Sequence, residues 1–419
     1  MDIKITALSK RRWKGYILPI GYKTNRIYEV VINGASDGED GIQSGVIDKG
    51  YNVTITPRDT ETPVIHTPDE YDYPDRLFDE YHENAFAWGV ESDGKLLAAI
   101  ETCPEEWSNR LRICELWVDE SLRSRGVGRR LIEIALEQAR LERRRAVILE
   151  TQSCNYNAIG FYRHMGFKLI GFDSCCYANN DLERGEVRLE FGRLLNKQPR
   201  LSRDELIIRP ERPGEYHDAE CMVRRAFYNK YKRGCDEHFL VRNLRSDGAY
   251  LPEYSRIALH DGKIVGAIYY SRSYVKPDDS NDEMTDGYPT ITFGPLCVEP
   301  EYQGRGVGEY LLRETLELAK SAGESGVIIF GEPDYYPRLG FVTCDKFNIT
   351  DHEGESSPAF MAYRLNDSFD KVHGRFHEAD VFGVTEGFSK TEGFAEYEAG
   401  FPYIEKQRFP CQWAEKREE

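Results

Sequence analysis

Two short stretches of the sequence place glycines between a β-rich run and an amphipathic helix. They are RSRGVG at residues 123–128 and QGRGVG at residues 303–308. A glycine loop that opens a helix directs several backbone N–H groups and the positive end of the helix dipole at one point, and glycine lets the backbone approach an anion closely. Each stretch therefore predicts a loop that binds a phosphate group.

The spacing of these loops excludes two common classes of phosphate site. A P-loop needs a Lys followed by Ser or Thr after its last glycine, which neither stretch has. The dinucleotide fingerprint needs a third glycine, whereas Gly126 and Gly128 stand alone and Glu309 follows the second pair. A tight turn without a ligand is the alternative for either loop, and the occurrence of two such loops favours a ligand.

The surrounding residues indicate that the loops belong to two homologous domains. Arg123 and Gln303 are 180 positions apart, and two later Gly-Phe pairs are 174 positions apart. Between these points each copy carries an amphipathic helix, a short β-rich run and an aromatic helix. Upstream, each copy carries a hairpin that turns at Asp-Gly, at residues 93–94 and 261–262.

This repeat predicts the division of the chain. We expect an N-terminal domain at residues 1–198 and a C-terminal domain at residues 205–370. A polar segment with a proline, residues 194–205, is the predicted linker. The acidic segment 276–289 is expected to form an excursion between two strands of the second domain, and the tail 371–419 to pack on that domain.

The composition restricts the classes of protein and partner. The chain has 419 residues and 40% hydrophobic content, enough for two or three packed domains. No apolar run is long enough to span a membrane and the N-terminus lacks a secretory signal, so we expect a cytoplasmic location. A formal charge of −17 disfavours nucleic acid and anionic membrane as partners and suits a cationic small molecule. The ten cysteines show no metal-ligand spacing, so we expect no metal.

Together these residues resemble the GNAT N-acetyltransferases, whose acyl-CoA pyrophosphate loop has the pattern Q/R-x-x-G-x-G/A. The first domain is similar to streptothricin acetyltransferases through LETQSCNYNAIGFYRHMGFKLIGFDSCCYAN at 149–179. The second is similar to YhbS-like acetyltransferases through GPLCVEPEYQGRGVG at 294–308 and GEPDYYPRLGF at 331–341. The resemblance implies an α/β (α+β) fold of two tandem domains, each a mixed, mostly antiparallel sheet that splays between its fourth and fifth strands and is flanked by helices.

The resemblance also implies acetyl-CoA as cofactor and the residues that hold it. In each domain the strand before the loop would offer backbone groups to pantetheine, and the loop would hold the pyrophosphate. In the first domain these residues are Leu116, Trp117, Val118, Arg123, Ser124, Arg125, Gly126, Val127, Gly128 and Arg129, followed by Asn155 and Tyr162. In the second they are Leu296, Cys297, Val298, Gln303, Gly304, Arg305, Gly306, Val307, Gly308 and Glu309, followed by Tyr336.

Direct attack of an amine on acetyl-CoA needs a base for the amine proton and an acid for the departing thiolate. Tyr162 matches the family's general acid; packing on a core-facing helix is the alternative. For the base we favour Glu115, two residues before Trp117 and hence on the same face of its strand. Glu150 is the rival, and an exposed strand carboxylate without a catalytic role is the alternative for Glu115.

The second domain differs at the base. Tyr336 aligns with Tyr162, but Pro295 stands where the first domain has Glu115. Glu332 is the candidate replacement, with a helix-capping acid as the alternative. We expect this domain to bind acyl-CoA, and the sequence allows it to be either catalytically active or silent.

The expected function is N-acetylation of a primary amine on a small cationic acceptor, of the streptothricin or aminoglycoside type, by a monomer or homodimer. Cys154 stands where the streptothricin group usually has asparagine, which suggests a different acceptor. Acetylation of protein or peptide N-termini is the alternative reaction. A further alternative is a tandem that binds acyl-CoA and in which one domain is catalytically silent.

Overall fold

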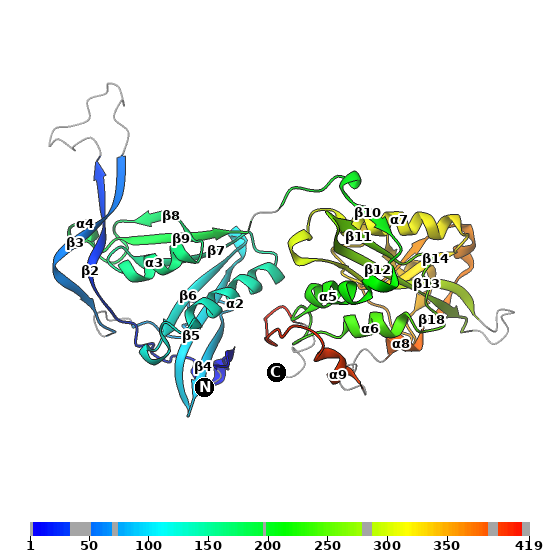
Figure 1. Cartoon of the computed structure of the whole chain (residues 1–419), viewed down its shortest axis with the longest axis horizontal. Helices are drawn as coiled ribbons and strands as arrows, with labels where there is room; N and C mark the ends of the chain where they lie inside the picture. The colour runs from blue at the N-terminus through cyan, green and yellow to red at the C-terminus, as the bar shows by residue number, and fades with distance from the viewer. Residues whose placement is uncertain are drawn as a thin grey trace, which may run out of the picture. The chain divides into compact units, whose positions relative to one another are not determined.

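The chain folds into two compact units (Figure 1). The computed structural model describes residues 3–33, 52–68, 74–195, 198–278, 287–383 and 393–412. Unit 1 comprises residues 1–196 and 408–411, and unit 2 comprises residues 197–407 and 412–419. No helix in the described ranges is long and apolar enough to cross a membrane.

Unit 1 is built on a seven-stranded sheet in the order β1-β4-β5-β6-β7-β9-β8. The neighbours β6 and β7 run parallel and the other pairs are antiparallel. The strands are β1 (Thr6–Ala7), β4 (Phe86–Ser92), β5 (Lys95–Glu105), β6 (Arg110–Val118), β7 (Ala146–Gln152), β8 (Lys168–Asp173) and β9 (Arg188–Leu194). The helices are α1 (Lys10–Trp13), α2 (Val127–Leu141), α3 (Tyr156–His164) and α4 (Asp181–Arg184).

The core of unit 1 lies between this sheet and α2. The helical spacing of apolar residues predicted the buried face of α2, and Leu131, Ile134 and Ala135 are buried there. Gln138 on the same face is buried as well, and its Oε1 accepts a hydrogen bond of 2.7 Å from the Thr102 hydroxyl. That bond satisfies a polar group that would otherwise be costly in the core.

A two-stranded arm in unit 1 was not expected from the sequence. It consists of β2 (Tyr22–Asn33) and β3 (Asn52–His66), which pair antiparallel. Tyr28 of this arm stacks on Tyr156 of α3 with ring centroids 5.3 Å apart. Most side chains of β3 are exposed, so the strand lacks the apolar alternation by which sequence predicts a strand.

Unit 2 repeats the plan, with a sheet in the order β10-β11-β12-β13-β14-β17-β15. An extra strand, β18, pairs with β12 and β16. The strands are β10 (Ile207–Arg209), β11 (Arg256–His260), β12 (Lys263–Lys276), β13 (Tyr288–Val298), β14 (Gly326–Phe330), β15 (Val342–Thr343), β16 (Ile349–Thr350), β17 (Phe360–Arg364) and β18 (Gly374–Glu378). The helices are α5 (Tyr216–Phe227), α6 (Glu237–Leu244), α7 (Val307–Ser321), α8 (Asp380–Gly383) and α9 (Phe394–Glu398).

Both units contain the predicted Asp-Gly hairpins. Ser92 pairs with Lys95 and His260 with Lys263, which leaves two residues in each turn. The backbone φ angles are 49° and 78° at residues 93–94, and 49° and 78° at residues 261–262. Two positive φ values in succession define the hairpin turn for which Asp-Gly is suited.

Short 3₁₀ turns connect many of the elements. They are η1 (Glu106–Ser108), η2 (Glu120–Leu122), η3 (Arg203–Glu205), η4 (Pro213–Glu215), η5 (Pro300–Tyr302), η6 (Pro337–Leu339), η7 (Cys344–Phe347) and η8 (Asp367–Lys371). The turn η6 replaces the aromatic helix that we expected in the second copy. Pro337 has no N–H for an α-helical bond and sits at the start of this turn, which explains the difference from α3.

The C-terminal tail contributes to both units. Strand β18 and helices α8 and α9 belong to unit 2, whereas residues 408–411 belong to unit 1. Phe409 is buried there, and the indole N–H of Trp88 donates to the Arg408 carbonyl at 3.0 Å. These four residues therefore depart from the expectation that the whole tail packs on the second domain. Residues 279–286 of the predicted acidic excursion lie outside the described residues.

Candidate active site

The fourth and fifth strands of each sheet separate along their length. In unit 1, β6 and β7 pair only from Arg110–Ala146 to Ile113–Leu149. In unit 2, β13 and β14 pair only at Ile291–Val327. Past these points the described strands diverge, which leaves backbone groups of residues 115–118 and 292–298 without a partner on the fifth strand. This is the opening into which the predicted pantetheine would insert.

A β-bulge sets the faces of β6 at this opening. Glu101 pairs with Glu115 and Thr102 with Ile113, so Cys114 is an extra residue. As a result, Ile113 and Leu116 both contact the core beside α2, whereas Trp117 packs in a separate cluster with Leu77 and its neighbours. Because Glu115 and Trp117 share a face, the bulge directs the Glu115 carboxylate away from α2.

Glu115 is a buried acid among other acids. Only 7% of the Glu115 residue is exposed to solvent. Burial raises the pKa of Glu115 well above its usual value, and the charges of four other carboxylates raise it further: Asp75, Glu101, Glu150 and Asp79. A carboxyl with a raised pKa is suited to accept and release a proton near neutral pH.

Glu150, the rival base, has a different environment. Its carboxylate forms an ion pair with Arg188 and lies 3.6 Å from Arg112 Nη1. It is also more exposed than Glu115, with 36% of its side chain accessible. Its carboxylate is thus already engaged by guanidinium groups, which makes it less available than Glu115 to an incoming amine.

Tyr162 lies on α3, close enough to Glu115 for the two side chains to interact electrostatically. The residue is 9% exposed and belongs to the main core of unit 1. Burial raises the pKa of Tyr162, and the charge of Glu115 raises it further. A tyrosine that stays protonated at neutral pH can donate a proton. Tyr162 therefore has the protonation state that the predicted general acid requires.

The two glycine loops share one backbone conformation. Ser124 and Gly126 have φ angles of 59° and 80°, and Gly304 and Gly306 have φ angles of 76° and 94°. The first helical bonds run from the N–H of residue 130 to the carbonyl of residue 126, and from residue 310 to residue 306. The amides of residues 126–129 and 306–309 therefore point out of the helix ends. An added Cβ at Gly126 would meet nothing within 4 Å, so the space beside this loop is open.

The second glycine of each loop makes room for an aromatic ring. A Cβ at Gly128 would lie 3.4 Å from Cζ of Phe161, and a Cβ at Gly308 would lie 3.1 Å from the hydroxyl of Tyr335. The sequence predicts that these glycines allow close approach of the anion. The structure adds a packing role between the loop helix and the aromatic segment.

The first residue of each loop motif holds the loop itself. Arg123 Nε donates to the Val118 carbonyl at 3.2 Å, and Gln303 Nε2 donates to the Val298 carbonyl at 3.1 Å. Both side chains therefore join the loop to the end of the preceding strand. Asn155 is likewise occupied, because its Oδ1 accepts from the Ala158 N–H at 3.2 Å and caps α3.

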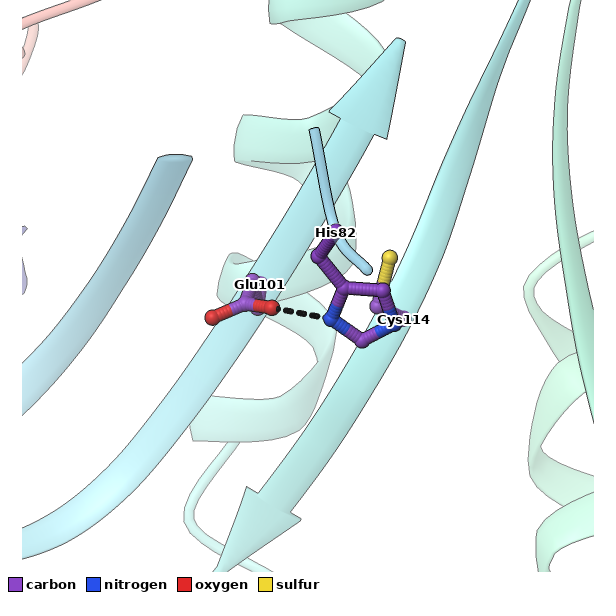
Figure 2. Close-up of side chains that lie close together, drawn as sticks. All are labelled: His82, Glu101 and Cys114. Atoms are coloured by element: carbon purple, nitrogen blue, oxygen red, sulfur yellow. Dashed lines mark hydrogen bonds and ion pairs between the residues drawn. The ribbon is translucent and has the colours of Figure 1, made fainter. Parts of the chain in front are cut away.

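A further cluster beside the opening had no counterpart in the sequence analysis. Figure 2 shows His82 between Glu101 on β5 and Cys114 on β6. The potential ligand atoms lie within 4.8 Å of one another. However, His82 Nδ1 is 2.7 Å from Glu101 Oε1, a hydrogen-bond distance. Two ligands of a tetrahedral zinc ion would stand about 3.3 Å apart. The hydrogen bond between His82 and Glu101 therefore joins the segment before β4 to the sheet.

The corresponding region of unit 2 has hydroxyls and different acids. Burial raises the pKa of Tyr336, with Tyr335, Tyr270 and Glu332 as nearby groups that raise it further. Glu332 Oε1 accepts a hydrogen bond of 2.9 Å from the Tyr231 hydroxyl. No carboxylate replaces Glu115 on β13, since Pro295 occupies that position.

One acid of unit 2 was not predicted. Burial raises the pKa of Glu237, at the start of α6, to about 7, and the charge of Asp236 contributes. The charge of Glu237 also acts on Tyr231, the partner of Glu332. Unit 2 therefore has two acids close to its tyrosines, both from segments other than β13.

Comparison with known proteins assigns the family. The acetyltransferase (GNAT) family matches residues 56–167 and 217–341, more than half of the chain. The chain belongs to the GNAT family. This places it among enzymes that transfer acyl groups, and it confirms the predicted tandem of two GNAT folds.

Three relatives illustrate the range of similarity. The uncharacterised N-acetyltransferase YjhQ of Escherichia coli (strain K12) is 37% identical over 105 residues, 25% of this chain and 55% of YjhQ. Streptothricin acetyltransferase of Streptomyces lavendulae is 35% identical over 88 residues, 21% of this chain and 47% of that protein. The chain thus spans about half the length of these two relatives.

The third relative is matched over nearly its whole length. The uncharacterised N-acetyltransferase YhbS of Escherichia coli (strain K12) is 27% identical over 177 residues, 41% of this chain and 97% of YhbS. A crystal structure of Escherichia coli YhbS in complex with CoA matches with a TM-score of 0.37 at 25% identity, covering 45% of this chain and 96% of that chain.

The GNAT sequence motifs predicted the loops and missed the groups around Glu101 and Glu115. His82, Asp75 and Asp79 come from a segment without a motif, so only the fold brings them to β5 and β6. One signal was present, because Glu101 interrupts the apolar run of β5 and is fully buried. A buried acid in an apolar strand indicates a partner elsewhere in the chain.

Proposed function

We propose that unit 1 transfers acetyl from acetyl-CoA to a primary amine of a small cationic acceptor. The observation that carries the proposal is the burial of Glu115 among Asp75, Asp79, Glu101 and Glu150. A cationic amine bound there would relieve the repulsion among these carboxylates, whereas a neutral or anionic acceptor would not. The similarity to streptothricin acetyltransferase agrees with this acceptor class.

The first loop fits the cofactor. Its amides at 126–129 leave the helix end, open space lies beside Gly126, and Arg125 and Arg129 stand on the same loop. These residues would hold the pyrophosphate, and the backbone of residues 116–118 would face pantetheine. When bound, acetyl-CoA supplies an activated thioester whose acetyl group passes to the amine, with CoA leaving as the thiol.

The residues of unit 1 would move two protons in this reaction. Glu115, ionised, accepts a proton from the bound ammonium, directly or through water, so that the nitrogen lone pair becomes available. Tyr162 donates its hydroxyl proton to the departing sulfur. The second proton that the nitrogen must lose to become an amide passes to solvent, from which Tyr162 regains its own proton. The carbon–nitrogen bond forms as the carbon–sulfur bond breaks, so the protein forms no covalent bond.

For unit 2 we propose binding of acyl-CoA at the second loop. The support is the shared conformation of the loops, with two positive φ angles at matching positions and amides that point out of the helix end in the same way. The absence of a carboxylate at position 295 separates this proposal from the one for unit 1.

An acceptor screen with the full chain tests the proposed reaction. Release of the CoA thiol and the mass of the product would be followed with acetyl-CoA and three sets of acceptors: streptothricin and aminoglycoside amines, uncharged small amines, and peptides with free N-termini. We expect transfer to the cationic small molecules. Transfer to peptide N-termini alone would contradict the proposed acceptor class.

A further inference from the structure

The two phosphate loops differ in charge at equivalent positions. Unit 1 has Arg129 and Arg130 in the first turn of α2, whereas unit 2 has Glu309 and Tyr310 in the first turn of α7. An acid at this point opposes the binding of a phosphate, because it lies beside the amides that would receive the anion. Taken alone, the second loop is therefore the poorer anion site.

A side chain from outside the loop brings back a positive charge. Arg200 precedes the first 3₁₀ turn of unit 2, and its Nη2 lies 2.9 Å from Glu309 Oε2. Its guanidinium also stands over the Tyr310 ring, 5.0 Å from the centroid. A Cβ built on Gly306 would lie 3.1 Å from Arg200 Cζ, so the guanidinium is directly beside the loop glycine.

The backbone around Arg200 is fixed to the same loop. The Leu201 N–H donates to the Arg305 carbonyl at 3.0 Å, and Arg305 Nε donates to the Pro199 carbonyl at 3.1 Å. The Tyr310 hydroxyl donates to the Leu201 carbonyl at 3.0 Å. The backbone of residues 199–201 is thus held on both sides of Arg200, so the segment need not be ordered when a ligand binds.

We propose that Arg200 is a phosphate-binding residue of unit 2 that supplies the charge which Arg129 supplies in unit 1. A guanidinium has five N–H groups, and contacts to Glu309 and Tyr310 leave donors for a phosphate. The side chain is 52% exposed, so an anion can reach it. The inference rests on the proposed binding of acyl-CoA by unit 2, and the ligand is a phosphate group of CoA.

The test measures CoA binding to the full chain by calorimetry with unit 1 blocked. Gly126→Asp blocks the first loop, because aspartate tolerates a positive φ and places a carboxylate where the pyrophosphate would lie. In this background we expect Arg200→Ala to weaken CoA binding by roughly 10-fold or more, the usual effect of losing a charge-assisted hydrogen bond. Arg200→Lys should weaken CoA binding less than Arg200→Ala does, since lysine keeps the positive charge but lacks the paired N–H donors of a guanidinium.

Arg203 offers a matched control. It lies on the same segment and forms an ion pair of 2.5 Å with Glu314, but that partner is on the body of α7 and not in the loop. Arg203→Ala should leave CoA affinity within about twofold, as expected for an exposed ion pair distant from the ligand. Glu309→Gln should restore part of the affinity lost in Arg200→Ala, because it removes a negative charge beside the loop amides. In Arg200→Ala alone, Glu309 keeps Arg313 as a partner, with Arg313 Nε 2.9 Å from Glu309 Oε1.

The outcomes separate the alternatives. Tighter binding by Arg200→Ala would make Arg200 a plug that competes with the cofactor, and unchanged binding would show that it makes no contact; either result overturns the proposal. Loss of all binding in the Gly126→Asp background with Arg200 intact would instead refute CoA binding by unit 2 itself. The same titrations with dephospho-CoA, which lacks the 3′-phosphate, identify the phosphate that Arg200 binds. If Arg200→Ala still weakens binding of dephospho-CoA, the contact is to the diphosphate; if the weakening disappears, the contact is to the 3′-phosphate.

Discussion

At the scale of single residues, the proposed chemistry depends on an acid whose pKa the fold raises. Glu115 is buried beside four other carboxylates, and each of these conditions raises its pKa. Glu101 next to it is held by His82 and by the Phe78 N–H, so its charge is compensated. Glu150 is compensated by Arg188. Glu115 has no such partner among the described side chains, which makes it the acid best able to take a proton.

The first prediction concerns the rate of Glu115→Gln. We expect kcat/KM for a cationic amine to fall by roughly 10²-fold or more, the range for loss of a general base. The loss should be largest between the raised pKa of Glu115 and the pKa of the amine, where the acid is ionised and the amine still carries its proton. At higher pH the amine is already free, so the variant should approach the wild type. A pH profile of both proteins checks this, and parallel profiles would contradict it.

The second prediction is that the same substitution stabilises the protein. Because the pKa of Glu115 is raised in the folded state above its usual 4.5, the folded state loses stability as pH rises through the folded pKa. Glutamine removes this loss, so Glu115→Gln should raise Tm at pH 7 by about 2–4 °C for each ~1 kcal/mol regained. At pH 4 the two proteins should melt within about one degree of each other. A lower Tm of the variant at pH 7 would show that the carboxylate is satisfied in the folded state.

At the scale of elements, the site depends on how a strand, a loop and a helix meet. The loop glycines at 126 and 306 are in the left-handed region, and those at 128 and 308 face an aromatic ring. One motif thus combines a backbone requirement with a packing requirement, because the ring of Phe161 covers the first turn of α2. The segment that carries Tyr162, the proposed general acid, therefore also contacts the loop.

The third prediction separates these two requirements. Gly128→Val would push its methyl groups into the Phe161 ring, since a Cβ alone already stands 3.4 Å from Cζ. We expect a loss of about 1–3 kcal/mol in unfolding free energy, as for other overpacked sites, with weaker CoA binding by unit 1. Gly160→Ala on α3 is the control, because its Cβ would meet nothing within 4 Å. It should be neutral or stabilising by up to about 1 kcal/mol. Equal melting of the two variants would contradict the packing role.

The elements show what the sequence can and cannot predict. The loops, the Asp-Gly hairpins and the amphipathic face of α2 follow from local patterns, because each is decided by residues within one or two turns of the chain. The arm of β2 and β3 has mostly exposed side chains, and η6 begins at a proline in a segment otherwise like α3. The pairing of His82 with Glu101 and of Arg200 with Glu309 joins distant residues. The acid Glu101 within the apolar run of β5 indicates that a partner exists, but no local pattern identifies that partner as His82 or pairs Arg200 with Glu309.

At the scale of the whole molecule, the chain contains one fold twice with its chemistry distributed unequally. Unit 1 keeps a carboxylate on its fourth strand and a basic loop, whereas unit 2 has proline on that strand and an acidic loop residue paired with Arg200. Both units keep the tyrosine and the loop conformation. The features that would bind the cofactor are therefore common to the units, and those that would activate an amine are not.

The last prediction assigns amine acetylation to unit 1. The double variant Glu332→Gln with Tyr336→Phe removes the hydrogen-bonded acid and the buried tyrosine of unit 2, and it touches no residue of unit 1. We expect it to keep amine acetylation within about twofold of wild type, whereas Glu115→Gln loses roughly 10²-fold under the same conditions. Thermal melting confirms that both variants are folded. Glu237, whose pKa burial raises to about 7, is the acid to substitute next if the double variant loses activity, because a site in unit 2 would then need a base. Loss of acetylation in the double variant together with its retention in Glu115→Gln would place the chemistry in unit 2 and refute the assignment of Glu115.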